Sequence, residues 1–193
     1  MEFPTIENWR KILVPGDEKF GKPEFYEYYK TKYEIAKRFH PEHIAEIGVR
    51  WGYSAYAFLC ACPVSSYSGF DMISGGHGGV KDDTFDYVKQ LLENSFSESL
   101  IKLFHIDTRK LDILGTGFDF IHIDGNHTES GAYHDMEISF KSLNSGGVLL
   151  VDDFTYIAGV ARAVRQFVKD YNSYIKSTEE IESIRGEYII IKN

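Results

Sequence analysis

Short apolar segments that alternate with helical segments run through most of this 193-residue chain. Apolar, strand-like patterns cover residues 43–48, 67–72, 100–106, 118–124 and 147–152. Helical patterns cover residues 54–62, 84–96, 128–143 and 159–172. Because strands separated by helices pair in parallel through right-handed crossovers, this alternation predicts an α/β fold with helices on both faces of one sheet.

The two ends of the chain depart from this alternation. Strand patterns at 179–184 and 187–192 are joined by Arg185-Gly186, which is too short for a crossover, so at least one strand runs antiparallel. Residues 1–40 form a lead-in with a helix from Pro23 to His40, and residues 41–193 form the core. The length of the chain predicts one domain over residues 1–193.

Composition narrows the classes of partner and compartment. The net charge of −8 argues against a nucleic-acid partner, because proteins of that class present a basic face. No apolar run reaches the roughly 18 residues that cross a bilayer, and the N-terminus lacks a signal-peptide pattern. Cys60 and Cys62 are predicted to be buried free thiols. We therefore expect a cytoplasmic protein with no membrane partner.

A glycine-containing turn follows the first strand pattern. It reads Glu46-x-Gly48-x-x-x-Gly52-Tyr53-Ser54, where the dinucleotide fingerprint would be G-x-G-x-x-G. Glycine lets a backbone approach a ligand closely, because no Cβ stands in the way. A carboxylate beside this turn suits a ligand with hydroxyl groups or a positive charge better than it suits a diphosphate.

Acidic residues end every strand of the predicted parallel set. They are Glu46, Asp71, Asp107, Asp124, Asp152 and Asp153. Asp71 follows Gly48 by 23 residues (71 − 48), close to the spacing at which a carboxylate holds ribose hydroxyls. Asp107-Thr108 is placed to bond a base edge. The first three strand ends therefore predict a nucleoside site, and the chain lacks the G-x-x-x-x-G-K-[ST] pattern of triphosphate sites.

Three of these acids converge if the fourth and fifth strand patterns are neighbours. Asp124, Asp152 and Asp153 would then repel one another, and a divalent cation with oxygen ligands, Mg²⁺, Mn²⁺ or Ca²⁺, would relieve the repulsion. The alternative is that one aspartate caps a helix and another faces solvent. His127 is either a general base or a local packing residue, and His122 is expected to be a core residue with a hydrogen-bond partner.

These motifs together resemble class I S-adenosylmethionine-dependent methyltransferases. The resemblance rests on the Glu46–Ser54 turn, on Asp71, on Ile123-Asp124-Gly125-Asn126-His127 and on the segment 146–153. It implies a Rossmann-like, seven-stranded, mostly parallel sheet whose seventh strand is antiparallel and inserted before the sixth. Within the class, the chain looks most like metal-dependent O-methyltransferases of small molecules, including antibiotic-sugar and cephalosporin-hydroxylase-associated proteins.

The resemblance also implies roles for individual residues. S-adenosylmethionine would be held by Glu46, Gly48, Gly52, Tyr53, Ser54, Asp71, Met72, Asp107, Thr108 and Asp124. Mg²⁺, or Mn²⁺ or Ca²⁺ in its place, would be held by Asp124, Asp152 and Asp153. Some relatives carry an Asp base two residues after the first ligand. Because that position here is the neutral Asn126, the catalytic assignment passes to Asp124 and His127.

The expected reaction is methyl transfer to a hydroxyl of a small-molecule acceptor with divalent-metal assistance. Two alternatives stay open: a non-catalytic binding or interaction protein of the same fold, and an NAD-dependent reductase. Against the reductase, the third glycine is missing and Tyr26-x-x-x-Lys30 precedes the first strand. Specificity is assigned to the N-terminal segment, to the glycine-rich loop 74–83, which is either a lid or a surface connection, and to the turn 126–131. The tyrosine-rich N-terminal helix is where a homo-oligomer would pack.

Overall fold

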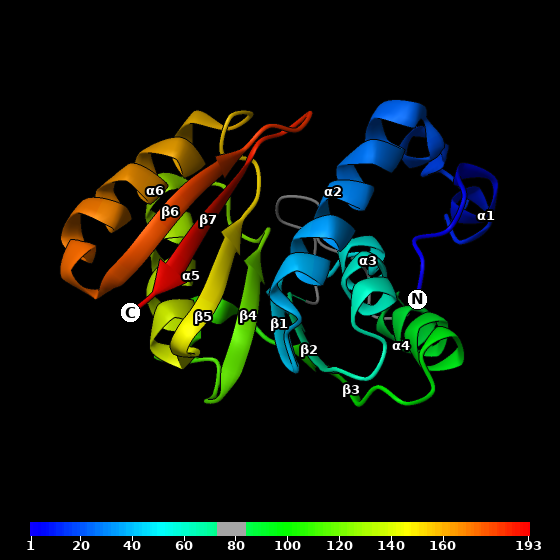
Figure 1. Ribbon diagram of the computed structural model, residues 1–193, viewed down its shortest axis with the longest axis horizontal. Helices are drawn as coiled ribbons and strands as arrows, with labels where there is room; N and C mark the ends of the chain where they lie inside the picture. Colours follow the sequence, from blue (N-terminus) through cyan, green and yellow to red (C-terminus); the bar gives the residue numbers. More distant parts are fainter. Residues whose placement is uncertain (73–83) are drawn as a thin grey trace.

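A computed structural model describes residues 1–72 and 84–193 (Figure 1). The glycine-rich loop 74–83 lies outside the described residues. The strands are β1 His43–Ile47, β2 Ser66–Asp71, β3 Ile101–His105, β4 Phe118–Ile123, β5 Leu143–Val151, β6 Ile175–Ile181 and β7 Glu187–Lys192. The α-helices are α1 Ile6–Lys11, α2 Pro23–Phe39, α3 Tyr53–Ala61, α4 Thr84–Ser95, α5 Glu129–Ser142 and α6 Ala158–Asp170. Single 3₁₀ turns cover Glu18–Gly21, Thr108–Lys110 and Asn172–Tyr174.

The seven strands form one sheet in the order β3-β2-β1-β4-β5-β7-β6. The first five strands in sequence pair in parallel, whereas β7 is antiparallel to both β5 and β6. This arrangement confirms the predicted Rossmann-like α/β fold with an antiparallel seventh strand inserted before the sixth. Because the parallel strands share one direction, their carboxyl ends lie along a single edge of the sheet.

Two strands begin earlier than their apolar patterns indicated. β5 begins at Leu143 and β6 at Ile175. The first residues of β5, Asn144 to Gly146, are exposed, and most of β6 is polar because it forms the edge of the sheet. Apolar alternation identifies only the buried parts of such strands, so the polar starts were missed.

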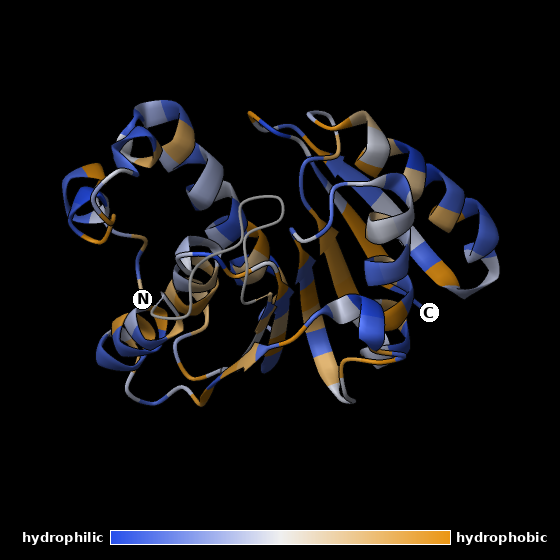
Figure 2. Ribbon diagram, turned by 180° about the vertical axis from the view of Figure 1, so that it is seen from behind, coloured by the Kyte–Doolittle hydropathy of each residue, from blue (hydrophilic) through white to orange (hydrophobic). Residues whose placement is uncertain are grey.

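Each face of the sheet has its own hydrophobic core. Side chains alternate along β5, so that Val148 and Leu150 face one core and Leu149 and Val151 face the other. Helices α2, α3 and α4 cover the first face, and α5 and α6 cover the second (Figure 1). The central strands between these helices are coloured mainly as hydrophobic in Figure 2. Helices on both faces confirm the layered arrangement predicted from the sequence.

Helix α2 carries the N-terminal residues onto the first core. Pro23 starts the helix at a position where its missing N–H costs nothing, and His40 ends it in a left-handed conformation (φ 48°) before Pro41. The lead-in packs on the same core: the indole N–H of the fully buried Trp9 donates to the carbonyl of Phe20 at 2.9 Å. No helix among the described residues is long and apolar enough to cross a membrane.

Candidate active site

The end of β1 and the end of β4 meet at the carboxyl edge of the sheet. The amide of Asp124 donates to the carbonyl of Ile47 at 2.8 Å, which extends the pairing of the two strands by one residue. Gly48 adopts a φ of +91°, and a Cβ built on it would lie 2.0 Å from the carbonyl oxygen of Asp124. Only glycine fits there. The glycine-containing turn is thereby held against the segment that carries the candidate catalytic residues.

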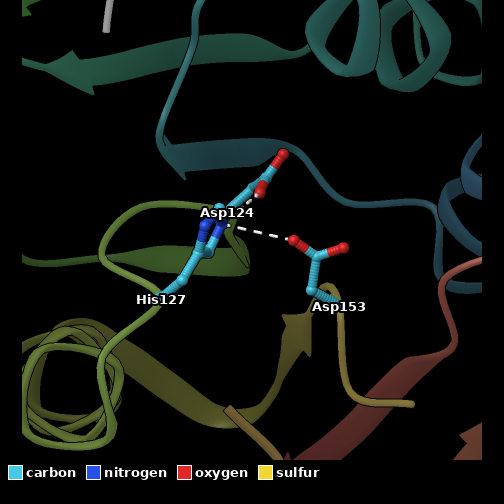
Figure 3. A group of neighbouring side chains, drawn as sticks. All are labelled: Asp124, His127 and Asp153. Carbon is cyan, nitrogen blue, oxygen red and sulfur yellow. Dashed lines mark hydrogen bonds and ion pairs between the residues drawn. The ribbon is translucent and has the colours of Figure 1, made fainter. Parts of the chain in front are cut away.

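Asp124, His127 and Asp153 form one group of side chains at this edge, which we call the Asp–His–Asp cluster. The Nε2 atom of His127 lies 3.2 Å from Asp124 Oδ1 and 3.2 Å from Asp153 Oδ2. Figure 3 shows the imidazole ring between the two carboxylates. One ligand atom from each of the three side chains falls within a span of 4.8 Å. The structure therefore brings the predicted Asp124, His127 and Asp153 together.

Electrostatics within the Asp–His–Asp cluster favour binding of positive charge. Burial, followed by the negative charge of Asp152, raises the pKa of Asp124 to about 6. The hydrogen bond to Asp124 raises the pKa of His127 above its usual value, against the opposing effect of burial. Burial, then the charge of Asp152, raises the pKa of Asp153. The negative charge of Asp152 thus destabilises the carboxylates of both Asp124 and Asp153, and a proton or a cation at the cluster relieves the repulsion.

Asp153 is oriented toward the cluster by an uncommon backbone conformation. Its φ is +60°, in the left-handed region that Asp tolerates better than most residues. The side chain is fully buried; Oδ1 accepts a hydrogen bond from Arg185 at 3.0 Å. Oδ2 is buried and, among the described residues, makes no hydrogen bond, but it lies 3.2 Å from His127 Nε2 as an ion-pair contact. A buried carboxylate oxygen that faces a second carboxylate and an imidazole fits a cation site, because such a charge is costly to bury without a positive partner.

Asp152 does not join its neighbour in the cluster. Its Oδ2 accepts hydrogen bonds from Tyr28 and, at 3.1 Å, from Lys32, on the side of the sheet that α2 covers. Its Oδ1 accepts the backbone N–H of Asp153 at 2.8 Å. The predicted trio of Asp124, Asp152 and Asp153 is therefore not the group that the structure assembles. His127 takes the place in the cluster that was expected for Asp152. Consecutive residues at a strand end turn their side chains to opposite sides, so Asp152 points away from Asp153.

On the other side of the glycine-containing turn, Asp71 lies at the end of β2. Its Oδ2 accepts the backbone N–H of Arg50 at 2.8 Å, and its Oδ1 accepts that of Met72 at 2.7 Å. Arg50 has a φ of +47°, so the carboxylate holds a residue of the turn in the left-handed conformation. Gly52, with a φ of +73°, then begins α3. Asp71 and Met72 are half-buried beside the turn.

Two of the predicted cofactor residues, Glu46 and Tyr53, have other contacts. Glu46 is fully buried, its carboxylate bonded to His122 at 2.8 Å and to the hydroxyl of Tyr67, so it does not reach the edge of the sheet. The hydroxyl of Tyr53 accepts the backbone N–H of Val14 at 3.0 Å, which ties the N-terminal segment to α3. Ser54 follows in the first turn of α3 and is half-buried.

The segment after β3 is fixed by its own side chains. Arg109 donates to both carboxylate oxygens of Asp107, each at 2.8 Å, and lowers the pKa of that carboxyl. The hydroxyl of Thr108 donates to Asp135 Oδ1 at 2.7 Å. Asp135 Oδ2 accepts the backbone N–H of Asn126 at 3.3 Å, so one buried carboxylate joins the predicted base-binding segment to the turn that carries His127.

Sequence reasoning missed Lys32, Arg185 and Asp135. Lys32 follows Tyr28 and Tyr29 by four and three residues, a spacing that places a charged residue on the buried face of α2. That position was the available signal, since a lysine is rarely fully buried without a partner. Arg185 was read only as part of a turn, and Asp135 only as part of a helix. His122 was predicted correctly as a core residue with a hydrogen-bond partner.

Comparison with solved structures identifies the fold. The SAH-bound methyltransferase PaMTH1 of Podospora anserina superposes with a TM-score of 0.71 and 17% identity, covering 99% of this chain and 89% of that one. TomG of Streptomyces achromogenes, an O-methyltransferase involved in tomaymycin synthesis and solved with SAM, gives 0.67 and 15% identity, covering 100% and 91%. An SAH complex of an O-methyltransferase from Bacillus cereus gives 0.63 and 13%, covering 98% and 100%.

Comparison of sequences identifies the family. An uncharacterised protein of Acanthamoeba polyphaga mimivirus is 24% identical over an alignment of 189 residues, and the alignment covers 91% of this chain and 82% of that protein. The family model described as a methyltransferase domain matches residues 45–154, more than half of the chain, from β1 through the Asp–His–Asp cluster. The chain therefore belongs to the methyltransferase-domain family and has the fold of solved methyltransferases that bind SAM or SAH.

Proposed function

We propose that this enzyme transfers a methyl group to a hydroxyl of a small-molecule acceptor, with the Asp–His–Asp cluster as the centre that activates the hydroxyl. The observation that carries the proposal is the position of His127 Nε2, 3.2 Å from a carboxylate oxygen of Asp124 and 3.2 Å from one of Asp153. Two carboxylates that share an imidazole make a strong proton acceptor at the edge of the sheet where open α/β folds bind ligands.

The cofactor side of the site is assigned to the turn between β1 and α3. Asp71 is proposed to hold the ribose hydroxyls, and Asp107 and Thr108 to border the base. Gly48 and Gly52 keep the turn free of side chains, and Met72, Tyr53 and Ser54 border it. Because Glu46 is buried beneath the turn, its role is to support the turn rather than to touch the cofactor. S-adenosylmethionine would supply a methyl group on a sulfonium, so the protein has mainly to align the acceptor.

His127 is proposed as the general base. Its raised pKa makes it a stronger acceptor than a free imidazole, and Asp124 orients the ring through the 3.2 Å contact. The carboxylates of Asp124 and Asp153 are proposed to hold a divalent cation, for which the buried Oδ2 of Asp153, which makes no hydrogen bond, and the two carboxylates beside His127 are suited. Such a cation would supply positive charge that lowers the pKa of an acceptor hydroxyl.

Two lines of support point to a small acceptor. TomG, whose fold this chain shares, is an O-methyltransferase involved in the synthesis of a small molecule. The net charge of −8 does not suit a nucleic-acid acceptor. The homo-oligomer and the cytoplasmic location stay predictions from the sequence. The NAD-dependent reductase is not proposed further, because the family match identifies a methyltransferase.

The test combines binding and turnover. Isothermal titration with S-adenosylhomocysteine is expected to show binding, and titration with NADH is expected to show none. A methylation assay with a panel of phenols and sugar hydroxyls, run in Mg²⁺, in Mn²⁺ and in EDTA, then tests transfer and metal assistance separately. His127→Asn is expected to bind S-adenosylhomocysteine as the wild type does and to lose turnover. Binding without turnover on every acceptor would favour the non-catalytic alternative.

A further inference from the structure

Lys32 is a fully buried lysine at the centre of a polar network beneath the sheet edge. Its Nζ lies 2.8 Å from Glu187 Oε1, 3.1 Å from Asp152 Oδ2 and 3.2 Å from His122 Nε2. An ammonium group has three N–H donors and accepts nothing. The three contacts therefore use every proton of Lys32. They come from β7, from the residue after β5 and from β4, so one helical side chain joins three strands.

These contacts fix the protons of the neighbouring histidine. Because Lys32 only donates, His122 Nε2 must accept, and the ring proton of the neutral imidazole lies on Nδ1. Nδ1 then donates to Glu46 Oε1 at 2.8 Å. Burial, followed by the charge of Lys32, lowers the pKa of His122 far below its usual value, which agrees with a neutral ring. Lys32 is thus the permanent cation of the network that contains Glu46, His122, Asp152 and Glu187.

Asp152 is committed to this network by every contact it makes. Its Oδ2 accepts from Lys32 and from the hydroxyl of Tyr28, and its Oδ1 accepts from the backbone of Asp153. Burial raises the pKa of Asp152, but the charge of Lys32, together with His122 and the hydrogen bonds from Tyr28 and the backbone of Asp153, makes the net shift downward. Asp153, one residue later, has an oxygen that makes no hydrogen bond among the described residues and faces His127 Nε2 at 3.2 Å. The two consecutive carboxylates therefore differ in what each can still bind.

We propose that Lys32 is a positioning residue that withdraws Asp152 from the cation site, so that a divalent cation is held by Asp124 and Asp153 beside His127 and without Asp152. This inference rests on the proposed metal-assisted function. It departs from the ligand trio that the sequence implied, because the charge that would neutralise Asp152 is already part of the chain. Because Asp153 turns to the opposite side, the two consecutive carboxylates serve different positive charges: Asp152 pairs with Lys32, and Asp153 is left for the bound cation.

The direction in which Mn²⁺ affinity changes when Lys32 is replaced distinguishes this positioning role from a purely structural one. The ammonium of Lys32 repels a divalent cation at the cluster and also occupies the carboxylate that would add a further ligand. Replacing Lys32 by Met removes the charge at similar side-chain length and releases Asp152. Affinity for Mn²⁺ should then rise. A residue that merely supports the fold would give unchanged or weaker binding when it is removed.

The experiment measures Mn²⁺ binding to the full chain by electron paramagnetic resonance, with S-adenosylhomocysteine binding as the check that each variant is folded. Asp153→Asn is expected to weaken Mn²⁺ binding at least tenfold and Asp152→Asn less than threefold. Lys32→Met is expected to strengthen it at least threefold. Lys30→Met, on the exposed side of the same helix, is the matched control and should change nothing.

If Lys32→Met does not fold, the comparison of Asp152→Asn with Asp153→Asn decides alone, since Asp152→Asn keeps the contact between Lys32 and Glu187. Equal losses in the two aspartate variants would overturn the inference and restore Asp152 as a ligand. A wild-type chain that binds no Mn²⁺ would also overturn it. The proposed methyl transfer is judged separately, because transfer that continues in EDTA would survive that result and loss of S-adenosylhomocysteine binding would not.

Discussion

Gly48 and Asp124 are in backbone contact: a Cβ at residue 48 would meet the carbonyl oxygen of Asp124 at 2.0 Å. The glycine of the proposed cofactor turn is therefore also the residue that lets β1 and β4 end side by side. This contact joins the proposed cofactor turn to the Asp–His–Asp cluster, so a substitution at one should alter the other.

Gly48→Ala should destabilise the protein more than an alanine at another left-handed glycine. Gly117, with a φ of +87° against +91° for Gly48, has nothing within 4 Å of a built Cβ. Backbone strain alone predicts a loss of about 1–2 kcal/mol for Gly117→Ala. The clash should add roughly 1–3 kcal/mol at Gly48. Urea unfolding of both variants measures the difference, and equal losses would show that the contact relaxes without cost.

Activity should rise with pH along a limb set by His127. A base must be unprotonated to act, and the hydrogen bond to Asp124 raises the pKa of His127 above 6.5, so the limb should lie above that pH. Asp124→Asn removes the main cause of the shift and should move the limb to lower pH. The profile of kcat/KM against pH measures this, with the exposed Asp112→Asn as control. A limb that stays in place in Asp124→Asn would assign the proton to another group.

His127→Asn should separate the base from the ligand role. Loss of a general base typically lowers kcat by about 10²–10⁴-fold. If His127 is the base, Mn²⁺ affinity should fall by less than the drop seen in Asp153→Asn. Single-turnover rates and Mn²⁺ titration on the same preparation give both values. If the single-turnover rate and the Mn²⁺ affinity fell by the same factor, His127 would be a metal ligand instead.

Asp71→Ala should weaken cofactor binding, whereas Asp153→Ala should spare it. Asp71 holds the backbone of Arg50 and Met72 and is the proposed ribose ligand, so both the turn and a direct contact are lost. Loss of one charged hydrogen-bonding group corresponds to roughly 1.5–3 kcal/mol, or about ten- to a hundredfold in affinity. Calorimetry with S-adenosylhomocysteine tests this. Equal effects of the two substitutions would contradict the division of the site into cofactor and acceptor sides.

Asp135→Asn should loosen the turn that carries His127. The asparagine can still accept from Thr108, but its amide group would face the backbone N–H of Asn126, donor against donor. The expected loss is about 1–3 kcal/mol of stability, the range for an unpaired buried polar group. Urea unfolding measures the loss of stability. Slower turnover with unchanged cofactor affinity would show that the substitution also displaces the turn that carries His127. Asp119→Asn, which also removes one carboxylate that accepts backbone N–H groups, is the control at the opposite end of β4.

Strand direction was predictable because it follows from rules of chain connection. The short link at Arg185-Gly186 and the alternation before it required one antiparallel strand, and the resemblance placed it. The edge strand β6 was less visible, since Lys176, Thr178 and Glu180 face water and give no apolar pattern. Burial drives the sequence signal, so exposed parts of strands escape it.

The site was predictable as a location and less so as a set of contacts. Strand ends put Asp71, Asp124 and Asp153 on one edge, as expected. The sequence could not show that Asp152 turns inward, because that depends on Lys32, which is 120 residues away in the chain. The buried contacts of Glu46 could not be predicted for the same reason: its partners His122 and Tyr67 belong to neighbouring strands. Pairings across a sheet are set by tertiary packing rather than by local pattern.

The insertion of β7 between β5 and β6 has a consequence for how the chain folds. β6 is made before β7 yet can join the sheet only through it, and Lys32 of α2 finds Glu187 only when β7 is in place. Such distant pairings delay the rate-limiting step of folding. The strands that are synthesised first therefore cannot complete the sheet, and folding finishes only when β7 has paired with β5 and β6.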